Sequence, residues 1–190
     1  IFSDSTGRVW AGTKSGLYYA DSATPEDFHY FDEVPKHYVR ALAEDGHGAI
    51  WAGTGKGELY CIVSNTAKLF QPTDAQNPGA IWSLLADTDG TIWAGTFRGG
   101  LLRLRDGKFT RYGIKTGLPD NVICQILDDG HGQLWLGSHQ GIFSVAKTAL
   151  NDFAAGKSTF VPCVLYGRSD GLPSLECSGG YSPSAWRNPT

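Results

Sequence analysis

The stretch DGHGAIWAGT, residues 45 to 54, occurs in nearly the same form four times in this chain. The other copies read DSTGRVWAGT at 4 to 13, DTDGTIWAGT at 87 to 96 and DGHGQLWLGS at 129 to 138. Their tryptophans are separated by 41, 42 and 42 residues. A repeat of about 42 residues is typical of four-stranded propeller blades and of some helical arrays. The pattern inside the repeat decides between these two architectures.

Each copy begins with the turn motif DxxG. An aspartate side chain can accept a hydrogen bond from the backbone two residues later, and glycine adopts the positive φ that a tight hairpin requires. The turn residues are Asp4, Gly7, Asp45, Gly48, Asp87, Gly90, Asp129 and Gly132. Because each turn offers only one or two carboxylates, we interpret the aspartates as turn residues and not as calcium ligands.

Four short β-type runs surround each turn. One run precedes DxxG, as at 39–44, 81–86 and 123–128, and the run with the tryptophan follows it. A third run (LYYA, ELYCIV, LLRLR, IFSVA) and a closing aromatic run (FHYF, KLF, FTRY) complete the unit. Glycines every few residues exclude a helical array, since each costs roughly 1 kcal/mol inside a helix. We therefore expect four antiparallel strands in each repeat.

These runs are apolar on both faces, which suits sheets that pack between two neighbours. The sequence therefore predicts an all-β fold, a β-propeller of four-stranded antiparallel blades. We expect a single domain, present as a partial open arc of about four blades, with each tryptophan packed between adjacent blades. The expected repeats span about 1–38, 39–80, 81–122 and 123–176, and 177–190 begins a further blade. The absence of methionine, and a start inside a first strand, indicate a piece of a longer protein.

The last repeat departs from this rhythm after Val145. The segment KTALNDFAAGK at 147–157 predicts a short helix that is capped by Thr148 and ends at Phe153 or Ala155. The segment that follows contains no further DxxGxxW phrase.

Composition excludes several classes of function. A net charge of -3 and a pI of about 5.9 argue against a nucleic-acid partner, which would need a basic surface. Apolar runs such as IWSLLA are far shorter than the ~20 residues that span a bilayer. The cysteines lack the paired spacing of a zinc site and are interpreted as buried small side chains; they are Cys61, Cys124, Cys163 and Cys177. A disulfide between Cys163 and Cys177 remains an alternative.

Phrases such as VRALAEDGHGAIWAGTGKGELY and ICQILDDGHGQLWLGSHQGIFSV resemble the repeats of the two-component-regulator propeller family. The resemblance covers residues 1 to 145, and the tail resembles the part of such propellers before the closing blade. It implies a sensor module in the periplasmic, or extracytoplasmic, input region of a membrane-anchored bacterial regulator. In that family, two seven-bladed rings are often followed by a β-sandwich and a transmembrane helix.

Ligands of propellers usually meet the loops around one mouth of the channel. The side chains expected there follow each WAGT phrase or stand at the start of each innermost strand. The candidate ligand-binding residues are Lys14, Arg40, Lys56, Trp82, Phe97, Arg98, Asn121 and His139, with His37, Tyr38 and Asp120 beside them. Cations around one funnel would attract an anion such as an acidic sugar, and Trp82 could stack on a sugar ring. The alternatives are solvated loop charges and a Trp82 that packs in the core.

Three functions are consistent with these patterns. The first is a non-enzymatic ligand-sensing propeller that recognises a carbohydrate or another small anionic ligand. The second is a scaffold that binds a protein partner through its rim loops. The third is a propeller-fold lyase with His139 as its general base. No cofactor motif is found, and His47 and His131 lie in separate turns that offer no converging metal ligands.

Overall fold

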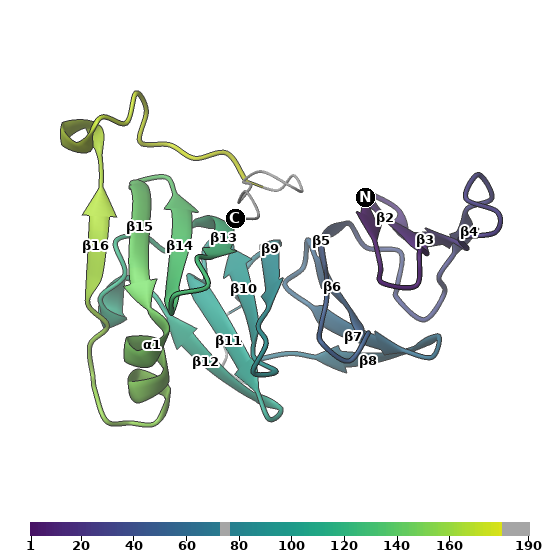
Figure 1. Ribbon diagram of the computed structural model, residues 1–190, viewed down its shortest axis with the longest axis horizontal. Helices are drawn as coiled ribbons and strands as arrows, with labels where there is room; N and C mark the ends of the chain where they lie inside the picture. The colour runs from purple at the N-terminus through teal and green to yellow at the C-terminus, as the bar shows by residue number, and fades with distance from the viewer. Residues whose placement is uncertain (73–76, 180–190) are drawn as a thin grey trace.

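The computed structural model describes residues 1–72 and 77–179 of the chain. These residues form four antiparallel sheets of four strands each, which stand side by side as an open arc (Figure 1). Within every sheet the strands follow one another in chain order. The all-β fold of propeller blades, expected from the repeat, is therefore confirmed.

The strand boundaries agree closely with the runs expected from the sequence. The first blade contains β1 (Phe2–Ser3), β2 (Val9–Thr13), β3 (Gly16–Ala20) and β4 (His29–Tyr30). The second contains β5 (Val39–Glu44), β6 (Ile50–Thr54), β7 (Leu59–Val63) and β8 (Thr66–Phe70). The third contains β9 (Ile81–Ala86), β10 (Ile92–Thr96), β11 (Leu101–Arg105) and β12 (Lys108–Tyr112). The fourth contains β13 (Ile123–Asp128), β14 (Gln133–Ser138), β15 (Gly141–Ala146) and β16 (Cys163–Tyr166).

Three shorter elements complete the fold. The helix α1 (Lys147–Ala154) is inserted between β15 and β16, and the 3-10 turns are η1 (Ile114–Thr116) and η2 (Arg168–Asp170). The first strands of neighbouring blades, β5, β9 and β13, pack against one another. The fourth strands lie at the outer side of the arc.

The four blades share one strand register. In each blade the repeated tryptophan lies directly across from a residue of the third strand, in the pairs Trp10 and Tyr19, Trp51 and Cys61, Trp93 and Arg103, and Trp135 and Ser144. Since side chains alternate between the two faces of a strand, this register fixes which residues face the following blade.

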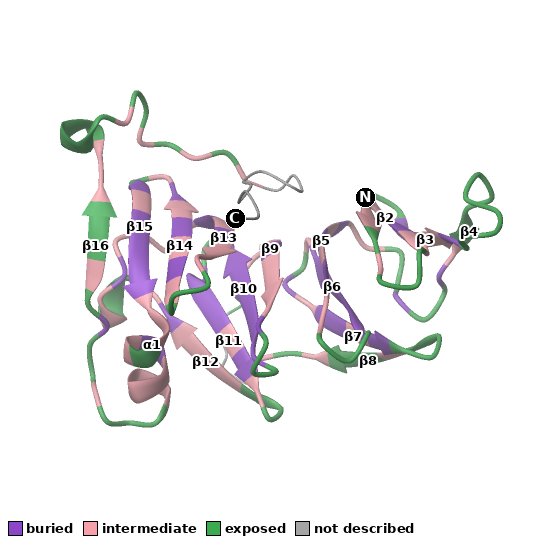
Figure 2. Cartoon of the chain, in the orientation of Figure 1, coloured by how far each residue is buried: buried purple, intermediate pink, exposed green. Residues whose placement is uncertain are grey.

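The hydrophobic core lies between blades, as expected (Figure 2). Trp10 packs with residues of the second blade, Trp51 with the third and Trp93 with the fourth. Trp10 and Trp93 are each 1% exposed. Trp135 is only half-buried; it stacks on Tyr166 at 5.2 Å between ring centroids and lines an apolar hollow of about 330 Å³.

The DxxG motif forms hairpin turns, which confirms the turn interpretation. In the second turn, Asp45 Oδ1 accepts the backbone N–H of His47 at 2.9 Å. Its other oxygen, Oδ2, accepts the indole N–H of Trp51 at 2.8 Å, six residues later. The same contact joins Asp4 to Trp10 and Asp87 to Trp93, so the tryptophan is anchored by its own turn. This hydrogen bond was not predicted from the sequence.

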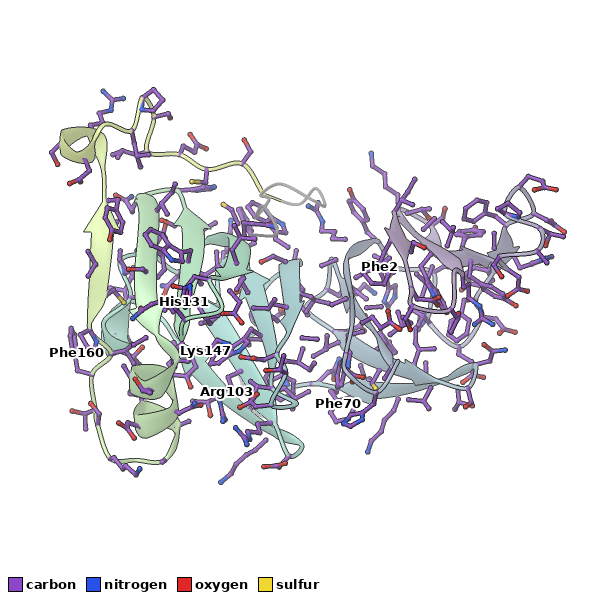
Figure 3. The ribbon with its side chains drawn as sticks, viewed as in Figure 1. Phe2, Phe70, Arg103, His131, Lys147 and Phe160 are labelled. Carbon is purple, nitrogen blue, oxygen red and sulfur yellow. The ribbon has the colours of Figure 1, made fainter. Side chains whose placement is uncertain are left out.

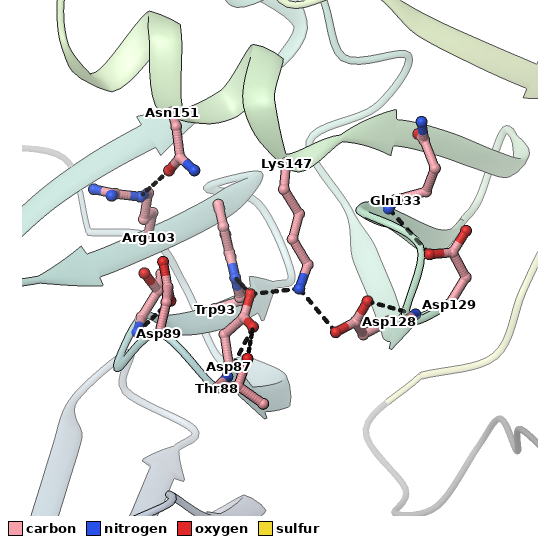
Figure 4. A network of polar contacts seen from close by, with 12 residues as sticks. Asp87, Thr88, Asp89, Trp93, Arg103, Asp128, Asp129, Gln133, Lys147 and Asn151 are labelled. Atoms are coloured by element: carbon pink, nitrogen blue, oxygen red, sulfur yellow. Dashed lines mark hydrogen bonds and ion pairs between the residues drawn. The ribbon is translucent and has the colours of Figure 1, made fainter. Parts of the chain in front are cut away.

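The predicted helix is present, but the predicted cap is wrong. The N-cap position of α1 is Ala146, which makes no side-chain capping hydrogen bond, and Thr148 lies inside the first turn. Strand β15 runs directly into the helix, so no loop residue is left to cap it. Lys147 instead anchors the first turn: its Nζ lies 2.7 Å from Asp87 Oδ2 and 2.8 Å from Asp128 Oδ2 (Figure 4).

The disulfide alternative is also wrong, because all four cysteines are free thiols. Cys163 pairs with Val145 on the outermost strand, whereas the Cys177 thiol lies near the carbonyl of Gly141. Four residues of β15 separate those two positions, which corresponds to about 13 Å.

The chain segment after η2 returns to the inner side of the fourth blade. The Cys177 N–H donates to the Ser138 carbonyl, and Cys177 packs on Gly137 as Ile123 packs on Gly95 in the preceding blade. That a further blade begins near residue 177 stays a prediction. The rest of the expected segment, 180–190, lies outside the described residues.

Candidate functional site

The candidate ligand-binding residues lie at one edge of the blades. In an antiparallel blade, the end of the second strand and the start of the first strand share an edge. The loops after β2, β6, β10 and β14 therefore lie beside the starts of β5, β9 and β13. The DxxG turns lie at the opposite edge, which removes His47 and His131 from this region.

Five side chains from three blades meet at this edge and are named the edge cluster: Tyr38, Arg40, Trp82, Phe97 and His139. The ring centroids of Trp82 and Phe97 are 4.7 Å apart, with an angle of 32° between the ring planes. His139 approaches Trp82 at 6.2 Å between ring centroids. Arg40 Cζ lies 4.3 Å from the Tyr38 ring centroid and 6.0 Å from that of Trp82. The cluster thus combines aromatic surfaces with a permanent positive charge.

Arg40 is the most unusual member of the edge cluster. Its Nε is buried and has no hydrogen-bond partner within residues 1–72 and 77–179. Contact of a guanidinium with aromatic faces is favourable, but it does not replace a hydrogen-bond acceptor. A ligand oxygen could satisfy this donor.

The C-terminal part of the described chain covers one side of the cluster. Gly179 packs on the Trp82 ring so closely that a Cβ there would overlap the ring. Cys124 Sγ donates to the Cys177 carbonyl at 2.9 Å, and burial raises the pKa of this thiol to about 12. His139 Nε2 lies 4.0 Å from Glu176 Oε1 in the same segment. Trp82 therefore packs against the C-terminal segment, in line with the alternative that this residue has a packing role. It also contacts the other side chains of the edge cluster.

The remaining candidates do not join the cluster equally. Arg98 lies over the Phe97 ring, with 5.1 Å between Cζ and the centroid, and so adjoins the cluster. Asn121 Oδ1 accepts the backbone N–H of Ile114 at 2.9 Å and thereby stabilises a loop. Lys14 follows β2 in the first blade, and no contact joins it to the cluster.

Lys56 belongs to a separate polar group. Its Nζ lies 2.9 Å from His37 Nε2, and His37 Nδ1 lies 2.8 Å from Glu58 Oε2. Neither Glu58 nor Glu176 was predicted from the sequence as a site residue. Glu58 follows a repeated glycine in the loop after β6, so its position could have been found from the repeat. Glu176 lies in the tail, where no repeat pattern gives its position.

Comparisons with known proteins agree with the repeat. Residues 76–98 and 117–140 match the family described as two component regulator propeller. Two segments of the chain thus match the repeat of this family. Each matched segment contains one repeated tryptophan phrase, that of the third and that of the fourth blade, and no curated protein sequence matches the chain significantly.

Solved structures share the fold. An extracellular domain from B. thetaiotaomicron, assigned to a hybrid two component system, has a TM-score of 0.68 and 22% identity over 95% of this chain and 24% of that chain. A second B. thetaiotaomicron extracellular domain, assigned to a one component system, has a TM-score of 0.63 and 22% identity over 77% of this chain and 23% of that chain. The chain thus spans about a quarter of the length of these domains.

Virginiamycin B lyase from Staphylococcus aureus is similar as well, with a TM-score of 0.66 and 15% identity over 97% of this chain and 56% of that chain. At these identities the likeness establishes the fold alone. No helix within the described residues is long and apolar enough to cross a membrane.

Proposed function

We propose that this propeller is a non-enzymatic, ligand-sensing part of an extracytoplasmic two-component regulator. A carbohydrate or another small anionic ligand binds at the edge cluster. The family match supports the regulatory role, and the extracellular domains with the same fold support the location. The edge cluster supports the choice of ligand, because it places aromatic rings and a guanidinium side by side.

The buried Nε of Arg40 carries this proposal. A buried donor without an acceptor costs about 1–3 kcal/mol, and a ligand carboxylate would recover that energy. Arginine binds carboxylates through a planar fork of donors, and Trp82 and Phe97 offer flat surfaces for the apolar face of a sugar ring. An acidic saccharide combines both of these complementary groups.

Isothermal titration calorimetry with two saccharides tests the proposal. The acidic probe is an oligogalacturonate, and the neutral probe is a galacto-oligosaccharide of the same length. Arg40→Gln should weaken binding of the acidic probe about tenfold or more and leave the neutral probe little affected. Trp82→Leu should weaken both probes. Lys68→Gln, on the outermost strand of the second blade, is the matched control and should change neither affinity.

Two results would overturn the proposal. If neither saccharide nor simple carboxylates bind, while a protein partner binds through the same loops, the propeller is a scaffold. If mass spectrometry shows that a bound ligand is cleaved, and His139→Ala abolishes the cleavage, the propeller is an enzyme with His139 as its base.

A further inference from the structure

A basic groove lies on the outer side of the third blade, between the β11–β12 hairpin and α1. Arg103 and Arg105 lie two residues apart on β11, so their side chains share one face. Thr110 pairs with Arg103, and Lys108 pairs with Arg105, which places all four on that face. With Asp106, Asn151 and the end of α1, they line a cavity of about 300 Å³. Figure 3 shows Arg103 on the side of the arc where α1 lies.

Asn151 holds the Arg103 side chain in a defined orientation. Arg103 Nε donates to Asn151 Oδ1 at 3.1 Å (Figure 4). Because Oδ1 accepts this bond, the amide nitrogen of Asn151 is left as a donor. Neither the two terminal nitrogens of Arg103 nor the Asn151 amide nitrogen has a hydrogen-bond partner in the described part of the chain. The groove therefore presents donors without acceptors.

The charges in the groove are only partly balanced. Arg105 is paired with Asp89 at 2.5 Å and lies 3.8 Å from Asp106. Arg103 and Lys108 form no ion pair with any carboxylate of the described residues. Since the whole chain carries a net charge of -3, this positive site is a local feature and not part of a generally basic surface.

The end of α1 does not account for these cations. The carbonyls of the last helical turn already accept backbone N–H groups, in the pairs Asn151 with Ala155, Phe153 with Gly156 and Asp152 with Lys157. The basic side chains are therefore not needed as hydrogen-bond donors to these carbonyls at the helix C-terminus.

The propeller repeat does not account for the arginines either. The position of Arg103, across from the repeated tryptophan, holds Tyr19, Cys61 and Ser144 in the other blades. The position of Arg105 corresponds to Val63 in the second blade. The blade fold is thus compatible with apolar or small residues at both places. The basic set occurs only in the third blade, where α1 lies against it.

We propose that this groove binds a tetrahedral oxyanion, a sulfate or phosphate that is either free or part of a monoester. The two terminal nitrogens of Arg103 match two oxygens of such an anion, and Lys108 adds a point charge. The Asn151 amide nitrogen is a further donor for a remaining oxygen. The groove lies away from the edge cluster, so the inference does not depend on the proposed sensing function.

Nuclear magnetic resonance titrations of the whole chain test this proposal. The probes are inorganic phosphate, inorganic sulfate and phenyl phosphate, each titrated at constant ionic strength. We expect saturable shifts of the Asn151 side-chain amide and of the Thr110 backbone amide. Equal affinities for inorganic phosphate and phenyl phosphate indicate a site for the free ion, and tighter binding of phenyl phosphate indicates a site for monoesters.

Substitutions then locate the binding site. Arg103→Gln should weaken binding at least tenfold, and Lys108→Gln, an exposed position that leaves the fold intact, should weaken it severalfold. Lys68→Gln, also on an outermost strand, should have no effect. The proposal fails if no probe produces saturable shifts at these amides. It also fails if Lys108→Gln binds like the unsubstituted chain, or if Lys68→Gln weakens binding as much as Lys108→Gln does.

Discussion

The ammonium group of Lys147 lies 2.7 Å from Asp87 Oδ2, and this contact joins the first turn of α1 to the DxxG turn of the third blade. The side chains are 19% and 5% exposed, so the pair is largely removed from water. Replacing Lys147 by Met leaves the Asp87 carboxylate buried without its cation. We expect the free energy of unfolding to fall by about 3 kcal/mol, measured by urea denaturation.

Lys157→Met is the matched control for Lys147→Met. Lys157 forms a pair with Asp152 at 3.2 Å, but the side chains are 71% and 51% exposed. Exposed pairs contribute little, so the change should stay within about 0.5 kcal/mol. If the free energy of unfolding falls equally in both variants, the buried ion pair of Lys147 contributes no more to stability than the exposed pair of Lys157.

The stability of the propeller should fall in acid. Burial raises the pKa of Asp87, but hydrogen bonds from Lys147 and Trp93 outweigh it, and the net pKa is below the ordinary value of 3.8. The pKa values of Asp4 and Asp129 are lowered in the same way by their turn contacts. A carboxylate with a lowered folded pKa stabilises the fold above its unfolded pKa, and this stabilisation is lost as the pH falls through the folded pKa.

We therefore expect urea midpoints that are constant from neutral pH down to about pH 5 and then decline below about pH 4. Asp87→Asn cannot titrate at this position, so its stability should be lower at neutral pH and should decline less in acid. Parallel pH profiles for the two proteins would contradict the assignment to Asp87.

The repeated tryptophan should contribute more to stability in the third blade than in the fourth. Trp93 is 1% exposed and lies between two blades, whereas Trp135 is half-buried at the open face. Trp93→Ala should cost about 3–5 kcal/mol, and Trp135→Ala about 1–2 kcal/mol. Thermal and urea unfolding of both variants measure this difference, and equal losses would show that Trp135 is as well covered as Trp93.

Gly100 cannot be replaced by a residue with a side chain. Its φ is +75°, and a Cβ there would overlap the Tyr112 carbonyl oxygen. Gly100→Ala should cost about 3 kcal/mol or more, because backbone atoms must move. Gly90 has a similar φ of +81° with open space around it, so Gly90→Ala should cost only about 1 kcal/mol. Circular dichroism during heating gives both values.

The regular part of the fold could be predicted because it is written four times. Runs of apolar residues bounded by aspartate and glycine gave the extents of β5, β9 and β13 correctly. The helix after β15 was found from its composition. Its cap was not, because a strand that runs straight into a helix leaves no loop for a capping residue.

The candidate site was less accessible from the sequence. The directions of the strands place the candidate residues at one edge of the blades. Which of these side chains contact one another depends on the distance between blades, and the sequence does not give that distance. Lys56 and Asn121 have local partners in His37 and the Ile114 N–H, and neither partner follows from the repeat. The hydrogen bond from Trp51 to Asp45 does recur, and its constant six-residue spacing was a signal that could have been used.

Each described blade contacts only its adjacent blades, and this arrangement affects local unfolding. Such an array unfolds locally, blade by blade. A blade that is covered on both faces is more stable than a blade that is covered on one. All residues of β6 and β10 are buried, whereas those of β2 and β14 are only partly so. Deuterium should therefore enter the backbone of the first and fourth blades early and reach the two central blades last.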